Sequence, residues 1–322
     1  MRPKVIVTGG SGFLATTLAG HLAARFHVRV LTRSPTQPHH IHWDGVNAGP
    51  WTRELESAHA LINFAGRSVN CRYTARNRRR MMDSRLLSTR VLARAVAACS
   101  APPKIWLNSS TATIYRHTFG PAWTESGEIA ATPEARDAFS IDLAAAWEHE
   151  FFSPPLPHIR RVALRTAIVF GTHPGTVFPI LRTLARFALA GRMGDGRQWV
   201  SWIHQLDFAR AVEFILGRDD LIGPVNVAAP NPISNAVMMR TFRELAGVNF
   251  SIPSPRWLLE IAAFFHRTET ELLIKSRHVI PGKLVAAGFE FQFPEFATAM
   301  RQLADLIRVA PVRKRILAVV PH

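Results

Sequence analysis

The residues with the clearest chemistry form a glycine-rich turn near the start of the chain, Thr8-Gly9-Gly10-Ser11-Gly12-Phe13-Leu14-Ala15. The turn follows a short β-branched run and precedes an amphipathic one, so it connects an expected strand to an expected helix. One glycine lets the chain turn and another lets the backbone approach a ligand, while the first helical amides face negative charge. The pattern predicts a site for the pyrophosphate of a dinucleotide.

A second position bears on which dinucleotide is bound. The next expected strand ends in Leu31-Thr32-Arg33-Ser34, where NAD enzymes place an acidic residue for the ribose 2′-hydroxyl. No acidic residue is present, and Arg33 would pair with a 2′-phosphate, with Thr32 or Ser34 as a hydroxyl donor. We therefore expect NADP(H) as cofactor. The alternative, an arginine in a solvated loop, stays open because arginine is abundant in this chain.

The elements that must position these residues alternate along the first half of the chain. The first 33 residues predict a strand, a helix and a strand. Further strands are expected at 59–63, 104–110 and 161–170, and long helices at 76–99 and 139–151. This alternation predicts an α/β fold with a Rossmann-type, doubly wound parallel sheet.

The pattern changes after residue 170, where the expected elements become short and mostly helical. Helices are expected at 177–190 and 207–217, and a strand at 224–228 that returns to the sheet. We predict three parts: an NADP-binding domain over 1–170, with its sheet completed by about 200–230, a smaller C-terminal substrate or lid domain over 171–200 and 231–310, and a frayed tail over 311–322.

Composition and charge narrow the function classes. The chain has 322 residues, 48% of them hydrophobic and 19% charged, which is ample for a core and excludes a disordered chain. The net charge of +16 would suit nucleic acid binding. However, only five of the 39 basic residues are lysines, and the arginines are spread over the whole length. Such a preference for arginine over lysine is typical of a genome with a biased base composition, so nucleic acid is not the expected partner.

Location and metal content follow from what the sequence lacks. No apolar run reaches the roughly 18 residues of a membrane span, and the N-terminus has no signal-peptide organisation. Cys71 and Cys99 are too few for a disulfide framework or a zinc site, and no metal-ligand spacing is found. We expect a cytoplasmic protein without a metal or a membrane span.

Longer motifs carry a resemblance to a known family. Together they resemble the extended and atypical short-chain dehydrogenase/reductases, and more narrowly the NAD(P)-binding "epimerase family" branch that has a short C-terminal domain of its own. The motifs are the segments 63–66 (N-F-A-G), 84–89 (S-R-L-L-S-T), 196–204, 223–232 and 279–291.

This resemblance implies a cofactor cleft and a class of substrate. The residues implied for the cleft are Gly9, Gly12, Phe13, Leu14, Thr32, Arg33, Phe64, Ala65, Gly66, Arg85 and Val169, with Arg80 adding charge near the phosphates. The implied substrate is a small molecule, a nucleotide sugar or another carbonyl compound. The resemblance also implies a homodimer formed through the helices expected at 76–99 and 139–151.

The sequence departs from the wider superfamily at the active site. Most members use a Tyr-x-x-x-Lys pair, in which the lysine lowers the pKa of the phenol, and a Ser or Thr that polarises the same substrate oxygen. Here Thr111 matches the hydroxyl, but the pair is absent from the chain. The tyrosine position falls on Ser140 and the lysine position on Ala144.

Two functions are consistent with this departure. The first is an NADP(H)-dependent oxidoreductase or nucleotide-sugar epimerase-like enzyme in which Thr111 acts with another proton donor, and Tyr115 is the leading candidate. Glu125, His204 and Asp207 are the other candidates. Each has a structural alternative: packing for Tyr115, a loop or cap position for Glu125, and the start of a helix for His204 and Asp207. The second function is a non-catalytic NADP(H)-binding redox-sensing or scaffold protein.

Overall fold

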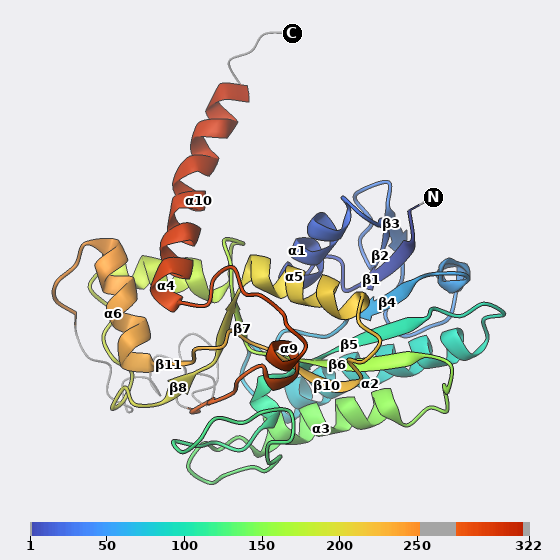
Figure 1. The fold of residues 1–322 in the computed structure, drawn as a ribbon, viewed down its shortest axis with the longest axis horizontal. Coiled ribbons are helices and arrows are strands. Elements are labelled where there is room, and N and C mark those ends of the chain that lie inside the picture. Colours follow the sequence, from blue (N-terminus) through green and yellow to red (C-terminus); the bar gives the residue numbers. More distant parts are fainter. Residues whose placement is uncertain (1, 252–274, 318–322) are drawn as a thin grey trace.

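A seven-stranded parallel sheet forms the centre of the molecule in the computed structural model, which describes residues 2–251 and 275–317 (Figure 1). The strand order is β10-β6-β5-β4-β1-β2-β3, and every neighbouring pair is parallel. The strands are β1 (Lys4–Thr8), β2 (His27–Thr32), β3 (His40–His42), β4 (Ala60–Asn63), β5 (Ile105–Thr111), β6 (Arg160–Thr166) and β10 (Gly223–Val227). The predicted doubly wound sheet is confirmed.

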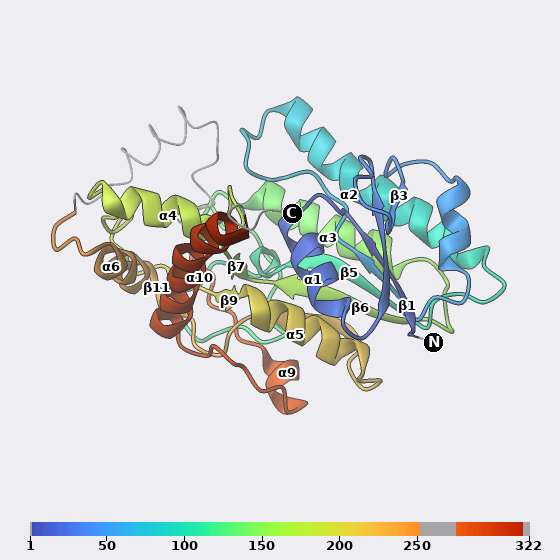
Figure 2. The same cartoon turned by 90° about the horizontal axis from the view of Figure 1, so that it is seen from above.

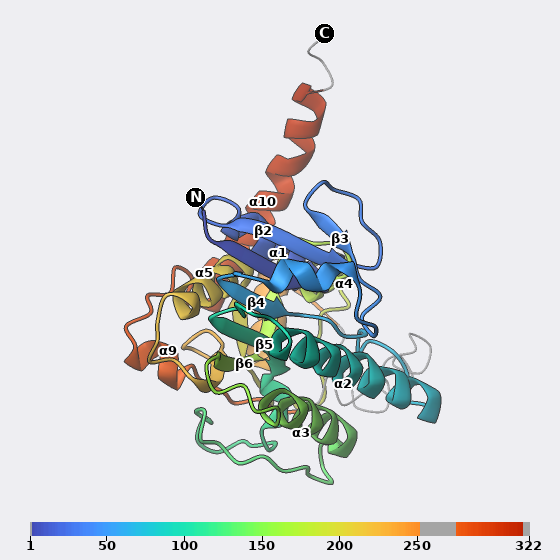
Figure 3. The same ribbon diagram turned by 90° about the vertical axis from the view of Figure 1, so that its right-hand side faces the viewer.

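Helices cover both faces of this sheet, as a parallel sheet requires. One face carries α1 (Phe13–Leu22) and α5 (Gln205–Leu216), and the other carries α2 (Ala75–Ala97) and α3 (Ala138–Phe152) (Figure 3). Side chains alternate between the two faces of the sheet along β1, so each face has a hydrophobic core of its own. Val5 and Val7 pack with α1 and α5, whereas Ile6 packs on the opposite side, toward α2 and α3. Two 3₁₀ helices, η1 (Pro50–Leu55) and η2 (Ala112–Ile114), lie in the connections.

A further hydrophobic core lies beside the sheet, in the lobe formed by α4 (Val177–Arg186), α6 (Asn235–Ala246) and α10 (Phe296–Leu317) (Figure 2). Its centre is aromatic, with Phe170, Phe178, Trp202, Phe242 and Phe296 all buried. The elements of this part are β7 (Ile168–Phe170), α4 (Val177–Arg186), β8 (Trp199–Val200), β9 (Trp202–His204), β11 (Ile233–Ser234), α6 (Asn235–Ala246), α9 (Gly282–Ala286) and α10 (Phe296–Leu317). Two small sheets, β11-β8 and β7-β9, complete it.

Two predicted elements differ from the structure. The single strand expected over 161–170 is two strands, because the amide of Ala167 makes a last hydrogen bond to Val227 of β10 and the next amide bonds to Ser201 instead. The chain thereby moves from the main sheet to β9. The helix expected over 177–190 ends at Arg186, because Ala188 adopts a left-handed conformation (φ 56°) that closes the helix.

The C-terminal region is helical, as predicted, and its last helix is longer than expected. The backbone of α10 continues to Leu317, so residues 311–317 are helical. Residues 252–274 of the predicted C-terminal domain and 318–322 of the predicted tail lie outside the described residues. The domain boundaries therefore stay a prediction.

Among the described residues, none of the helices combines the length and apolar character needed to cross a membrane. The same part of the chain contains no group of three His, Cys, Asp or Glu side chains that could hold a metal ion.

Candidate active site

The predicted site residues lie at the carboxyl edge of the parallel sheet. Thr8, Thr32, Asn63 and Thr111 each end a strand, and parallel strands end at the same edge. The chain passes from β1 to β2 on one side, whereas β4 lies on the other side of β1. The ends of β1 and β4 therefore form the switch point at which doubly wound sheets bind ligands.

The glycine turn at this point has the geometry of a phosphate cradle. Gly9 has a φ of 74°, and a Cβ placed on it would lie 2.7 Å from the carbonyl oxygen of Phe64. A Cβ on Gly10 would lie 2.2 Å from the side chain of Val30, so both positions require glycine. Gly12 is the N-cap of α1, and no side chain caps this helix. Its first amides are thus left for a ligand, which fits a dinucleotide pyrophosphate.

A buried polar network holds the chain that faces this turn. The hydroxyl of Thr8 donates to Asn63 Oδ1 (2.6 Å) and accepts from the amide of Phe64 (3.2 Å). Asn63 also accepts from the amide of Ala65 (3.0 Å) and donates to Asn108 (2.7 Å). This network was not predicted from the sequence, although polar residues at the ends of buried strands were a signal for it.

Arg85 lies against the N-F-A-G segment, as the resemblance implies. A Cβ on Gly66 would lie 3.4 Å from the guanidinium carbon of Arg85, whose charge also sits 5.0 Å from the ring of Trp147. Within the described residues, no carboxylate pairs with Arg85, and burial lowers its pKa to about 10. A desolvated cation without a counter-charge suits a bound phosphate.

The other two predicted arginines are exposed. Arg33 lies directly after β2, where its side chain forms no hydrogen bond or ion pair with any described residue, and the neighbouring Thr32 accepts from the amide of Ser34 (3.3 Å). Arg80 precedes Arg85 by five residues, which turns it by about 140° around α2. Arg80 therefore does not share the face of Arg85 that contacts Gly66.

The end of β7 meets the glycine turn from the other side. A Cβ on Gly171 would lie 2.3 Å from the ring of Phe13, and this ring lies 5.9 Å from that of His173. Val169, half-buried two residues earlier in β7, lies on the same strand. The structure thus brings together the turn and the segment expected at the nicotinamide side.

Thr111 ends β5 and is half-buried at this edge, paired in register with Thr166 of β6. Its hydroxyl oxygen accepts a hydrogen bond from the amide of Thr113 (3.1 Å). Ser140 and Ala144 are buried on α3, and Ala144 packs in a cluster with Tyr115. These two side chains provide neither a phenol nor an amine.

Tyr115 has a structural position. Its hydroxyl donates to Asn226 Oδ1 (2.7 Å) and accepts from Arg165 Nη1 (2.9 Å), and only 1% of the residue is exposed. Burial raises the pKa of the phenol. Arg165 in turn forms a bidentate ion pair with buried Glu148 (2.7 Å). The hydroxyl is enclosed in this network, so in this arrangement it presents no free hydrogen-bonding position to a substrate.

The remaining candidates also have structural roles. The carboxylate of Glu125 accepts from the amides of Asn226 (3.0 Å) and Lys283 (3.1 Å), which joins its loop to β10 and α9. His204 is buried and caps α5, and burial lowers its pKa. Fully buried Asp207 accepts from the amides of residues 292 and 293, at 2.9 and 2.7 Å.

The sequence pattern of the NAD dependent epimerase/dehydratase family matches residues 5–228. The chain belongs to this family. A second pattern, a domain of unknown function named DUF1731, matches residues 254–303. Among curated members, Epimerase family protein YfhF of Bacillus subtilis is 29% identical over 309 residues, covering 93% of this chain and 97% of the relative.

Solved structures of epimerase-family proteins agree with this assignment. Human epimerase family protein SDR39U1, solved with NADPH, is 29% identical, with a TM-score of 0.82 over 94% of this chain and 99% of that chain. A nucleoside-diphosphate sugar epimerase from Corynebacterium glutamicum shares the fold, at 24% identity and a TM-score of 0.74, over 100% of this chain and 63% of that chain. The predicted resemblance to the epimerase-family branch is confirmed.

This epimerase-family chain also contains a buried lysine that the sequence analysis missed. Lys275 pairs with Asp137 at 2.5 Å and donates to the carbonyl oxygen of Thr113 at 2.6 Å. Both charged side chains are almost completely buried. They join the C-terminal region to η2 and to the start of α3, beside Thr111. The available signal was an isolated lysine in a chain that uses arginine almost everywhere.

Proposed function

We propose that this epimerase-family protein binds NADP(H) at the switch point and acts as an oxidoreductase or nucleotide-sugar epimerase-like enzyme without the tyrosine–lysine pair. The observation that carries the proposal is the glycine turn, packed so closely against Phe64 that only glycine fits. When bound, the cofactor supplies or accepts a hydride. The NADPH in the solved human relative supports the choice of nucleotide.

Different residues of this chain would contact different parts of the cofactor. The amides at the start of α1 would face the pyrophosphate, and Arg33 would pair with the 2′-phosphate. Arg85 would add a desolvated positive charge near the phosphates. The backbone of Phe64 and Ala65 forms one wall and Val169 borders the nicotinamide side. Arg80, which is exposed on another face of α2, contributes at most long-range charge.

Thr111 is the residue that we assign to the substrate. Because its oxygen already accepts from Thr113, its O–H is oriented to donate to a further oxygen, and it donates to no described residue. A carbonyl or hydroxyl oxygen of a small substrate would receive this hydrogen bond. We propose a nucleotide sugar or another carbonyl compound as this substrate. A cytoplasmic location and a homodimer through α2 and α3 stay predictions.

A second candidate function is a non-catalytic NADP(H)-binding protein that senses redox state or acts as a scaffold. Two observations together favour it. Ser140 and Ala144 stand at the positions of the tyrosine–lysine pair. The other candidate proton donors, Tyr115, Glu125 and His204, have structural roles. Turnover by the wild-type protein distinguishes the two functions.

The cofactor preference is tested by changing Arg33 to Ala. We expect NADPH affinity to fall at least about tenfold and NADH affinity to stay unchanged, because a charge-assisted hydrogen bond contributes roughly 1.5–3 kcal/mol. Titration followed by nucleotide fluorescence measures both. Arg53→Ala, which removes an exposed arginine elsewhere, is the control. An equal loss for NADH and NADPH would contradict the assignment.

The enzymatic proposal is tested by following NADPH oxidation with a panel of aldehydes, ketones and keto sugars. We expect turnover of at least one compound, and Thr111→Val should lower kcat about 10- to 100-fold, because it removes a hydrogen bond to the reacting oxygen. Thr52→Val, in η1, is the matched control. NADPH binding without turnover of any compound would favour the non-catalytic function.

A further inference from the structure

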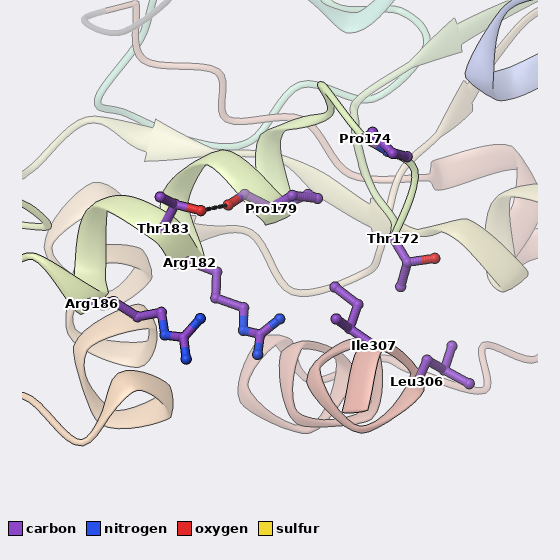
Figure 4. Close-up of a pocket in the computed structure, with 8 residues that line it drawn as sticks. All are labelled: Thr172, Pro174, Pro179, Arg182, Thr183, Arg186, Leu306 and Ile307. Atoms are coloured by element: carbon purple, nitrogen blue, oxygen red, sulfur yellow. Dashed lines mark hydrogen bonds between the residues drawn. The ribbon is translucent and has the colours of Figure 1, made fainter. Parts of the chain in front are cut away.

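A cavity of about 380 Å³ lies between α4 and α10 (Figure 4). One wall is α4, from which Arg182 and Arg186 extend into it, and the facing wall is α10, with Leu306 and Ile307. Thr172 and Pro174, in the loop after β7, line one end, and His173 between them lies with its ring 5.9 Å from that of Phe13. Its volume falls within the roughly 300–1,000 Å³ that is typical of small-molecule sites.

Among the described residues, no opposite charge compensates the two arginines. Within the described part of the chain, neither forms an ion pair or a hydrogen bond, and the nearby Asp305 pairs with Arg308 instead (3.5 Å). Arg182 is half-buried, and burial lowers its pKa, with the positive charges of Arg186 and Arg308 acting in the same direction. An anion between these guanidinium groups would remove an unfavourable arrangement of like charges.

The rest of the lining fits a small molecule better than a free ion. Thr172 presents a hydroxyl that forms no hydrogen bond with any described residue, whereas the hydroxyl of Thr183 already donates to the carbonyl of Pro179 (2.9 Å). Pro174, Leu306 and Ile307 supply apolar surface opposite the charges. The cavity thus offers two planar cations, one hydroxyl and an apolar wall.

We propose that this cavity binds a small molecule that carries a phosphate or pyrophosphate group. A guanidinium donates two parallel hydrogen bonds to such a group, and two guanidinium groups on successive turns of α4 can bind one pyrophosphate together. The apolar wall then covers the uncharged part of the ligand. None of the residues that line this cavity is one that we assign to the cofactor crevice, and the proposal does not rest on NADP(H) binding.

The test is a calorimetric titration of the full chain with inorganic pyrophosphate, with and without saturating NADPH. We expect binding in both conditions, and Arg182→Ala/Arg186→Ala should raise the Kd at least about tenfold in the presence of NADPH. Arg53→Ala/Arg94→Ala removes the same charge from exposed positions elsewhere and should bind like the wild type. Thermal unfolding checks that all variants are folded.

Three results would overturn the proposal. The first is a wild-type Kd for pyrophosphate weaker than about 1 mM. The second is an equal loss in both double variants, which would indicate general charge attraction. The third is complete displacement of pyrophosphate by NADPH, which would place it in the dinucleotide crevice. NADPH affinity itself should be unchanged in Arg182→Ala/Arg186→Ala, so a failure of the proposed cofactor site is recognised separately.

The planar geometry is tested with Arg182→Lys/Arg186→Lys. This variant keeps both charges but loses the forked donors, so we expect a Kd between those of the wild type and the alanine variant. Binding equal to that of the wild type would contradict the bidentate arrangement.

Discussion

Changing Gly9 to alanine is expected to lower the affinity for NADPH at least about tenfold. The new Cβ would lie 2.7 Å from the carbonyl oxygen of Phe64, and a φ of 74° costs a non-glycine residue roughly 1–2 kcal/mol. The turn must therefore move, and with it the amides that would face the pyrophosphate. A loss of 1.4 kcal/mol corresponds to a factor of about ten in Kd.

Gly20→Ala is the matched control for this change. Gly20 lies in the same helix, α1, and a Cβ there would meet no atom within 4 Å. We expect unchanged NADPH affinity and a gain in stability of about 0.5–1 kcal/mol, because alanine is the better helix former. NADPH binding by Gly9→Ala at wild-type strength would show that the nucleotide does not use this turn.

The largest effect on stability is expected for Glu148→Ala. This change leaves Arg165 buried without its bidentate partner, and breaking a buried ion pair costs about 3–5 kcal/mol. Ser110 loses a hydrogen bond of 2.5 Å at the same time. Because Arg165 also holds the hydroxyl of Tyr115, packing beneath the end of β5 is weakened too. Urea unfolding with linear extrapolation measures the loss.

Glu150→Ala provides the comparison on the same helix. Glu150 also pairs with an arginine, Arg90, at 2.6 Å, but this pair lies at the surface. Exposed pairs contribute roughly 0–1 kcal/mol, so we expect a loss at least about threefold smaller than for Glu148→Ala. Equal losses for the two variants would refute the view that burial makes the Glu148–Arg165 pair important.

The cofactor side of the site was largely predictable because it is local. The residues of the glycine turn are consecutive, and Arg33 directly follows the next strand, so their chemistry depends on one β-α-β unit whose geometry short-range patterns specify. Gly66 and Arg85 were recognised through longer motifs. Their contact agrees with that resemblance, whereas the charge expected from Arg80 near the phosphates stays a prediction, since five residues do not complete a whole number of turns and Arg80 lies on another face of α2.

The candidate proton donors could not be judged from the sequence. Tyr115, Glu125 and His204 are residue types suited to acid–base chemistry, but whether each one reaches the cleft depends on partners more than 75 residues away along the chain. Such partners enclose all three. The same long-range dependence hid Lys275, whose partners Asp137 and Thr113 precede it by more than 130 residues.

The sequence by itself determined the parallel sheet, the dinucleotide turn and the absence of the tyrosine–lysine pair, because these follow from periodicity and from consecutive residues. Only the tertiary structure decided which polar side chains are enclosed, where strand 161–170 leaves the main sheet, and that Arg182 and Arg186 share a cavity with α10. Burial and charge pairing are properties of contacts between distant segments. They arise when segments far apart in the sequence pack against one another, and no local pattern encodes them.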